Sequence, residues 1–344
     1  MKVVLVAGDF SQSEALAMLA ASLEEVGHQV LKYLESGKPH LYPIDAIKSA
    51  LSGADWLVCG ISELSAEEVT ATQFAIENNI KVALYADTFN AHRLPAFEPV
   101  RNAPVTIFTI NADEASDAQK LFPKATVIVT GNPRWESFFF PKMSRQEARQ
   151  LLQIDEDKIV LLCVGDKYLT QNLIQFGATV DVVHSLGWDK NVEIIFALHP
   201  GDQNERTLYD EVVAYAQCGA RILDRSIRSG DILMGCDFVV EFTSTIGIQA
   251  ACLRIPMINF CSTVAMRGKK LDKVKGPWKL TEGGASRLAR NGYIEEFAQV
   301  ISDMQTEELG NHLKKMQSAM FPKPESNETS FAIQSMCHAL ASTK

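Results

Sequence analysis

The sequence has no closely spaced pair of cysteines, and this absence argues against a zinc-binding protein and against a disulfide-stabilised one. Its seven cysteines are scattered, odd in number and without any C-x-x-C pair, so the sequence indicates neither a zinc site nor a disulfide framework. Most of them stand in apolar runs such as "WLVCG" and "VLLCVG", where a thiol behaves as a small hydrophobic group. A reducing cytosol therefore fits this chain best.

Long apolar runs and a surplus of positive charge are also missing. No run approaches the ~18 apolar residues that span a bilayer, and the run in "MKVVLVAGDF" is too short for a signal peptide. The formal net charge of −9 argues against bulk nucleic-acid binding, which normally requires a basic surface. We expect a cytoplasmic protein, with peripheral contact at the inner face of a membrane as an open alternative.

Apolar strand-like runs alternate with amphipathic helical stretches from end to end. Short, continuously apolar strands separated by helices are typical of a parallel sheet covered on both faces. At 344 residues the chain is long enough for two such domains, each with its own core. The predicted strands are 2–7, 29–34, 55–60, 81–86, 104–110 and 125–131 in the first half, and 158–165, 192–201, 220–224, 236–242 and 255–260 in the second.

A polar, charge-rich segment interrupts this rhythm, and we place a domain boundary near residue 142. The second domain then covers 143–325, and we expect a glycine-containing loop over 261–292. The last helix, about 326–344, should pack back on the first domain, 1–142. The fold class is thus α/β and GT-B-like in outline, with two Rossmann-like, doubly wound domains facing each other across a cleft.

The segment "EFTSTIGIQAACLRIPMINF", residues 241–260, runs a strand into a Ser/Thr cluster, a short helix and another strand. A helix N-terminus presents unpaired amides and a partial positive charge, and so holds anions. Ser244 or Thr245 would cap this helix, and Gln249 lies about one turn in, beside any bound anion. Two interpretations stay open, a plain helix cap and a seat for phosphate.

Two other strands of this half end in polar residues. "VLLCVGDK" ends at Gly165 with Lys167 just beyond it, and "IIFALHPG" ends at His199. Ligands collect beyond the carboxyl ends of strands in open parallel sheets. Because Lys167, His199 and Ser244 should share one rim of one sheet, the sequence predicts a binding cleft there.

Three segments in order, "VIVTGNPRWESF", "HPG" and "STIGIQAACLRIPMI", resemble motifs of the GT-B glycosyltransferases and the related nonhydrolysing UDP-N-acetylglucosamine 2-epimerases. A V-x-G-N-P segment closes the first domain of those proteins. Their second domain carries an H-P after a strand and then an S-T-x-G-x-E-A segment. The resemblance is good from about residue 125 to 260 and patchy before it.

This resemblance implies a nucleotide-sugar donor held by the second domain. Ser244 and Thr245 would meet its diphosphate, and His199 would lie beside the diphosphate or the sugar. The family glutamate that takes the ribose hydroxyls corresponds to Gln249. This is a departure, because a carboxylate accepts two hydrogen bonds from a diol, whereas an amide accepts at one end and donates at the other.

The first domain should hold the acceptor and any base. Asp9, Ser11 and Ser13 follow the first strand, and Asp87 and His92 follow another. In an inverting transfer a carboxylate or histidine removes the proton of the acceptor hydroxyl. Asp87 is our first candidate for this base and His92 the second, while a turn-capping role for Asp87 is the alternative.

The basic run "RGKKLDKVKGPWK", residues 267–279, allows three interpretations. It is a solvated surface, a loop over the cleft in which Arg267 offsets leaving-group charge, or a dock for a lipid-linked phosphate. No D-x-D stands at a strand end, and the basic groups and the helix terminus can neutralise a diphosphate. We therefore predict metal-independent chemistry and no cofactor.

Our leading hypothesis is a glycosyltransferase that moves a sugar from a nucleotide-sugar donor to a glycan or lipid-linked acceptor. The chain lacks the H-x-E-A-G-x-R segment that the 2-epimerases show after the strand that ends at residue 86, which favours transfer over epimerisation. A nucleotide-sugar 2-epimerase is the first alternative. A noncatalytic nucleotide- or glycan-binding protein, suggested by Gln249, is the second. Assembly as a homodimer is left open.

Overall fold

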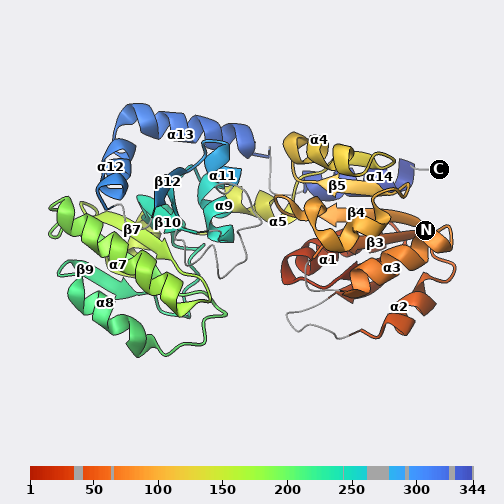
Figure 1. The fold of residues 1–344 in the computed structure, drawn as a ribbon, viewed down its shortest axis with the longest axis horizontal. Coiled ribbons are helices and arrows are strands. Elements are labelled where there is room, and N and C mark those ends of the chain that lie inside the picture. Colours follow the sequence, from red (N-terminus) through yellow and green to blue (C-terminus); the bar gives the residue numbers. More distant parts are fainter. Residues whose placement is uncertain are drawn as a thin grey trace. The chain divides into compact units, whose positions relative to one another are not determined.

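The structure, a computed structural model, describes residues 1–34, 42–62, 66–242, 244–261, 279–290, 294–324 and 330–342. The chain divides into two compact units (Figure 1). Unit 1 comprises Met1–Ser137 and Pro324–Lys344, and unit 2 comprises Phe138–Lys323. The sequence predicts the two boundaries at residues 142 and 325. That the units face each other across a cleft stays a prediction.

Unit 1 is built on a parallel sheet whose six described strands lie in the order β2-β1-β3-β4-β5-β6. The chain passes from β1 to β2 on one side and then to β3 on the other side of β1. The topological switch point of this sheet therefore lies between β1 and β3. The strands are β1 (Lys2–Ala7), β2 (Gln29–Leu34), β3 (Trp56–Gly60), β4 (Lys81–Ala86), β5 (Thr106–Thr109) and β6 (Thr126–Val129).

Both faces of this sheet are buried. Val4 of β1 belongs to a core that α2 (Ile44–Leu51) and α3 (Ala66–Glu77) cover. Val3, which points to the opposite face, belongs to a second core under α1 (Phe10–Glu25). Burial on both faces explains why the strands are continuous apolar runs rather than alternating ones. The other helical segments of unit 1 are η1 (Ala91–Arg93), η2 (Pro95–Val100), α4 (Ala112–Leu121) and α5 (Pro133–Glu136), while η3 (Ser137–Phe139) crosses the boundary.

The last described helix, α14 (Phe331–Ser342), belongs to unit 1 and packs beside α1 on the same face of the sheet. Its Ile333, Met336 and Leu340 are buried in one core with Leu16 of α1. The main chain at the start of the helix is also held, because the backbone N of Ala332 donates to a carboxylate oxygen of α5 at 2.9 Å. The predicted return of the C-terminal helix to the first domain is thereby confirmed.

Unit 2 repeats the doubly wound plan. Its six described strands are parallel and lie in the order β12-β11-β10-β7-β8-β9. The chain proceeds from β7 to β8 and β9 on one side and then crosses to β10, so the switch point lies between β7 and β10. The strands are β7 (Ile159–Val164), β8 (Val192–Ala197), β9 (Gly219–Ile222), β10 (Phe238–Glu241), β11 (Met257–Cys261) and β12 (Arg287–Arg290).

The helices of unit 2 cover this second sheet. Phe176 of α7 stacks on Phe196 of β8 with ring centroids 4.5 Å apart, inside a core that α12 also enters. A capping box between Ser144 and Glu147 begins α6. No helix in the described ranges is both long and apolar enough to cross a bilayer. The helices of this unit are α6 (Arg145–Leu152), α7 (Leu169–Ser185), α8 (Asp210–Tyr215), α9 (Thr245–Cys252), α11 (Lys279–Glu282), α12 (Ile294–Met304) and α13 (Glu307–Met320), with 3₁₀ turns η4 (Arg206–Tyr209) and η5 (Leu233–Gly235).

Two details differ from the sequence-based expectation. Strand β12 and helix α11 lie in the segment 261–292 that was expected to be a loop. β12 has no apolar run because it is an edge strand and exposes both of its arginines. The segment "SQSEALAMLAASLEEVG" predicts a helix that begins with a capping serine. Helix α1 instead begins at Phe10, because the Asp9 side chain caps it by accepting a bond from the backbone N of Ser11 at 2.8 Å.

The packing of α14 gives a first prediction. Met336→Ala should lower the free energy of unfolding by roughly 2–5 kcal/mol, because it leaves a cavity at a fully buried position. The matched control is Phe331→Ala, at a position that is 63% exposed on the same helix, which should change stability by less than about 0.5 kcal/mol. Urea denaturation measures both. Equal effects of the two changes would show that α14 is not anchored through this core.

Candidate functional site

Both sheets present polar side chains beyond the carboxyl ends of the strands that flank their switch points. In open parallel sheets this is where ligands bind. The strands concerned are β7 and β10 in unit 2, with β8 next to β7, and β1 and β3 in unit 1, with β4 next to β3.

Two amide side chains of α7 hold the strand ends of unit 2. Gln175 is 1% exposed, and its Nε2 donates to the carbonyl oxygens of Val164 and Val240, at 3.1 Å each, where β7 and β10 end. Asn172 is fully buried, and its Oδ1 accepts a bond from the backbone N of Asp166 at 2.6 Å. These bonds fix the main chain on both sides of the switch point.

The loop after β8 is anchored by a buried carboxylate, Asp202. Its Oδ2 accepts bonds from Tyr209 Oη at 2.5 Å and Asn172 Nδ2 at 3.1 Å, and its Oδ1 accepts from the backbone N of Asn204 at 2.9 Å. Burial acts to raise the pKa of Asp202, but the hydrogen bonds from Tyr209, Asn204 and Asn172 outweigh it and lower that pKa. The carboxylate is therefore ionised and holds the loop in place.

This anchored loop carries His199 at the carboxyl end of β8. The imidazole is exposed, and its Nδ1 accepts a bond from the backbone N of Gly201 at 2.9 Å, which fixes the ring. Lys167, just beyond β7, is also exposed, and its Nζ lies 5.7 Å from the centre of the Tyr168 ring. With Ser244, these residues follow three adjacent strands of one sheet, β8, β7 and β10.

Ser244 caps helix α9. Its Oγ accepts a bond from the backbone N of Ile246 at 3.2 Å, and its own backbone N donates to Oε2 of the buried Glu241 at 2.8 Å. Thr245 is exposed as the first residue of the helix. The capping interpretation is therefore observed, while the phosphate interpretation stays a prediction.

Gln249 is half-buried one turn into α9, and its Nε2 donates to the carbonyl oxygen of Gly230 at 3.2 Å. A Cβ at Gly230 would lie 2.3 Å from Gln249 Oε1, so a side chain at that position would displace the amide. The donor end of the amide is thus used within the protein. Arg267, which was also predicted to belong to the donor site, lies outside the described residues.

In unit 1, Asp87 directly follows β4 and is 5% exposed. Its Oδ2 accepts a bond from Ser11 Oγ at 2.8 Å, and its Oδ1 accepts from Gln12 Nε2 at 3.0 Å. Ser11 Oγ in turn accepts a bond from Arg134 Nη1 at 2.7 Å. Burial raises the pKa of Asp87, with the hydrogen bonds from Gln12 and Ser11 opposing the shift. A carboxyl with a raised pKa is suited to proton transfer near neutral pH.

A second buried carboxyl, Glu68 of α3, ties the ends of β1 and β3 together. It is fully buried; its Oε1 accepts a bond from the backbone N of Gly8 at 2.8 Å, and its Oε2 accepts from the backbone N and the Oγ of Ser62, both at 2.8 Å. Burial raises the pKa of Glu68 despite these three bonds, and Asp9 adds to the shift. Two carboxyls thus lie buried at one switch point.

The predicted acceptor-side residues have different roles. Asp9 caps α1, and Ser11 joins Asp87 to Arg134. Ser13 is 5% exposed and donates its hydroxyl to the last carbonyl of β1 at 3.3 Å, which indicates a structural role. Arg134 pairs through Nε with Glu14 Oε2 at 2.7 Å. The structure therefore groups Asp9, Ser11 and Asp87, and sets Ser13 apart.

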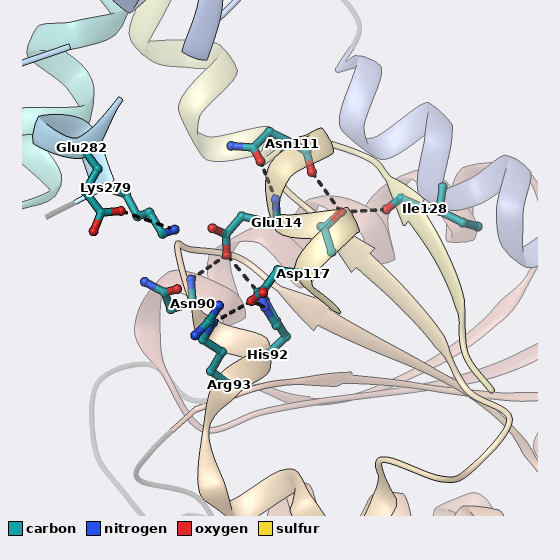
Figure 2. A network of polar contacts seen from close by, with 10 residues as sticks. Asn90, His92, Arg93, Asn111, Glu114, Asp117, Ile128, Lys279 and Glu282 are labelled. Carbon is teal, nitrogen blue, oxygen red and sulfur yellow. Dashed lines mark hydrogen bonds and ion pairs between the residues drawn. The ribbon is translucent and has the colours of Figure 1, made fainter. Parts of the chain in front are cut away.

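His92, the second candidate for the base, lies in a separate network (Figure 2). It is fully buried; its Nε2 lies 2.7 Å from Asp117 Oδ2 and its Nδ1 lies 3.5 Å from Glu114 Oε2. The same Glu114 oxygen accepts from the backbone N of Asn90 at 2.6 Å, and Arg93 Nε donates to Asp117 at 2.6 Å. A buried imidazole held between two carboxylates is placed to support this loop, so we retain Asp87 alone as the candidate base.

Several residues of the two sites were not foreseen from the sequence. They lie inside helices or near strand ends, where no sequence motif indicates their role, and only the long-range contacts of the fold reveal it. Glu241 alone could have been suspected from the sequence, because its carboxylate follows an apolar run and closely precedes the Ser/Thr cluster. The residues are Gln12, Glu68, Arg134, Asn172, Gln175, Asp202 and Glu241.

Comparison with solved structures shows the architecture. S. aureus MnaA, solved with UDP, has a TM-score of 0.66 and 12% identity over 98% of this chain and 96% of its own. The UDP-GlcNAc 2-epimerase from Neisseria meningitidis bound to UDP-GlcNAc has a TM-score of 0.62 and 13% identity, over 99% of this chain and 100% of its own. A glycosyltransferase from Rickettsia africae has a TM-score of 0.60 and 11% sequence identity, over 100% of this chain and 99% of its own. The chain has a GT-B-like fold.

The predicted GT-B and 2-epimerase resemblance is thus confirmed at the level of the fold. Most of the similar structures are UDP-GlcNAc 2-epimerases, so the comparison agrees better with the epimerase alternative than with the leading transferase hypothesis. No protein-family model and no curated protein matches the chain.

Within the described residues of this GT-B-like chain, no group of three or more His, Cys, Asp or Glu side chains is placed to hold a metal ion. Metal-independent chemistry stays a prediction.

The anchored loop after β8 gives a second prediction. Asp202→Asn should destabilise the protein by about 1–3 kcal/mol, because it removes a buried charged acceptor of several hydrogen bonds. Since the pKa of Asp202 is lowered on folding, the stabilisation that it provides is present above the ordinary aspartate pKa of 3.8 and is lost as the pH falls through the lowered value.

Urea denaturation as a function of pH tests this prediction. The difference between wild type and Asp202→Asn should be largest near neutral pH and should shrink in acid. Asp157→Asn, at an exposed position of the same unit, is the control and should change stability by less than about 0.5 kcal/mol. A difference that stays constant with pH would contradict an ionised anchor.

Proposed function

We propose that this protein is an enzyme that binds a UDP-sugar in unit 2 and acts on it as a nucleotide-sugar 2-epimerase. One observation carries the proposal. Polar groups gather at the switch points of both sheets, on a fold whose similar structures include a 2-epimerase bound to UDP-GlcNAc.

The nucleotide side of the proposal rests on unit 2. The N-terminus of α9 carries the partial positive charge of a helix dipole and the exposed Thr245, and Lys167 and His199 follow the next two strands of the sheet, β7 and β8. Helix N-termini and basic side chains both favour a diphosphate. The carboxylates of Asp202 and Glu241 are buried and bound to donors of the protein, which reduces their repulsion of a bound anion.

The proton-transfer side of the proposal rests on Asp87. Changing a stereocentre that bears a C–H bond requires a group to remove that proton and a group to return one to the opposite face. Asp87 is a buried carboxyl at a strand end, joined to Arg134 through Ser11. A base must be ionised, so kcat/KM should decrease as the pH falls through the raised pKa of Asp87.

Glycosyl transfer is the second candidate, and the sequence at the end of β4 favours it. Residues 85–91 are Y-A-D-T-F-N-A, where the 2-epimerases show H-x-E-A-G-x-R. Asp87 keeps a carboxylate in the third position of this window, but the histidine, the glycine and the arginine are missing. In a transferase the same carboxylate would take the proton of an acceptor hydroxyl.

A single incubation separates these reactions. Wild-type protein with UDP-GlcNAc in D₂O, followed by proton NMR, should show deuterium entering the sugar at C2 and a second stereoisomer appearing with UDP still attached. Release of UDP without exchange at C2 would support transfer or hydrolysis instead. Saturable binding without either change would support a noncatalytic binding protein.

The role of Asp87 gives a third prediction. Asp87→Asn should lower kcat by about 10²–10⁴, the usual contribution of a general base, while the Kd for UDP stays the same. The matched control is Asp117→Asn, because Asp117 lies in the same unit but pairs with His92 and Arg93. Turnover near the wild-type rate in Asp87→Asn would remove Asp87 from the mechanism.

A further inference from the structure

The switch point of unit 1 contains a buried oxygen whose hydrogen-bond donor is unaccounted for. Gln12 of α1 is 2% exposed, and its Nε2 donates to the carbonyl oxygen of Ile61 at 2.7 Å and to Asp87 Oδ1 at 3.0 Å. Among the described residues, no hydrogen-bond partner is found for its Oε1. A buried acceptor without a donor costs about 1–3 kcal/mol, so it calls for an explanation.

Reversing the Gln12 amide does not solve the problem. Oε1 would then face the carbonyl oxygen of Ile61 and the carboxylate of Asp87, three acceptors in a row, and both would lose the donor that they now share. The orientation of the amide is therefore set by these two partners. The missing donor must come from the other side of Gln12.

Glu68 lies on that side. A Cβ at Gly60, the last residue of β3, would lie 2.1 Å from Gln12 Oε1 and 2.9 Å from Glu68 Oε1. Both oxygens thus border the small space that glycine leaves there. An ionised Glu68 would place a second acceptor near Gln12 Oε1, whereas a protonated Glu68 could supply the donor.

We propose that Glu68 carries a proton on Oε1 and donates it to Gln12 Oε1, so that Gln12 presents Nε2 to Asp87 and Asp87 is the ionised member of the pair. Glu68 and Gln12 are then positioning residues for the candidate base. One hydrogen bond satisfies the buried oxygen of Gln12 and fixes the amide that faces Asp87.

The charges around the pair favour this assignment. Two ionised carboxyls at one buried switch point would repel each other and both lose hydration, so one of them is better neutral. Arg134 reaches Asp87 through Ser11, which stabilises the charge there. The described donors to the Glu68 carboxyl, from Gly8 and Ser62, are neutral. Burial raises the pKa of Glu68, and Asp9 adds to this shift as it does for Asp87. A further titratable group that interacts with Glu68 is the thiol of Cys59, whose own pKa burial keeps well above the usual value.

The titration of the two carboxyls tests the proposal without any substrate. The protein is labelled with ¹³C at the side-chain carboxyls of Asp and Glu, and the Glu68 and Asp87 signals are assigned by their loss in Glu68→Gln and Asp87→Asn. In wild type, Glu68 should keep the chemical shift of a protonated carboxyl at a pH at which exposed glutamates have ionised. Ionisation of Glu68 together with the exposed glutamates would overturn the proposal.

Gln12→Met provides the sharper test. It removes the acceptor of the Glu68 proton and the donor to Asp87 in a side chain of similar length. Glu68 should therefore titrate at lower pH than in wild type, and Asp87 at higher pH. A general loosening of the structure would move both carboxyls in the same direction, so parallel shifts, or an unchanged Glu68, would refute the link. If Gln12→Met does not fold, the wild-type titration of Glu68 decides.

Gln175→Met is the matched control, because Gln175 is the buried glutamine at the switch point of unit 2. It should leave the titrations of Glu68 and Asp87 unchanged. The consequence for turnover rests on the proposed function, but the titrations do not. A protonated Glu68 in a protein that leaves UDP-GlcNAc unchanged would uphold this inference and refute the proposed function. An ionised Glu68 in a protein that epimerises UDP-GlcNAc would refute this inference and uphold the proposed function.

Discussion

Each sheet of this protein depends on a buried glutamine amide at its switch point. The carbonyls at the ends of parallel strands must find donors, since an unpaired buried carbonyl is costly. Gln12, from the helix that follows β1, donates to the end of β3, and Gln175, from the helix that follows β7, donates to the ends of β7 and β10. These bonds hold α1 and α7, each the helix that follows the first strand of its sheet, across the strand ends. They therefore also fix the position of the other residues that these helices bring to the strand ends.

The two switch points then differ in charge, which suits them to different tasks. In unit 1 the first helix approaches two buried carboxyls, Asp87 and Glu68, whose pKa values burial raises. In unit 2 the carboxylate of Asp202 is buried and held by donors of the protein, while His199 and Thr245 are exposed. In the function that we propose, the doubly wound fold of unit 1 would carry the acid–base chemistry and that of unit 2 would recognise the anion.

The sequence predicts the strands well because burial on both faces demands continuous apolar runs, and it fails at β12, where an edge position lets arginine occupy the strand. Asp87 was found because it directly follows a strand. Glu68 and Gln12 were not, since their partners lie 6 to 75 residues away along the chain. His92 shares the strand-end signal of Asp87, and only the fold shows that Glu114 and Asp117 enclose it. Position along the chain identifies the rim of a sheet, but the hydrogen-bond partners of each rim residue, which only the fold shows, indicate its role.

Hydrogen–deuterium exchange with and without UDP tests the central claim, that the switch point of unit 2 is the nucleotide site. Backbone amides that a ligand covers exchange more slowly, and the affected peptides locate the contact. The account predicts slower exchange in peptides that cover residues 165–172, 199–204 and 244–252, with little change around Asp87. Protection confined to unit 1, or no protection at saturating UDP, would contradict it.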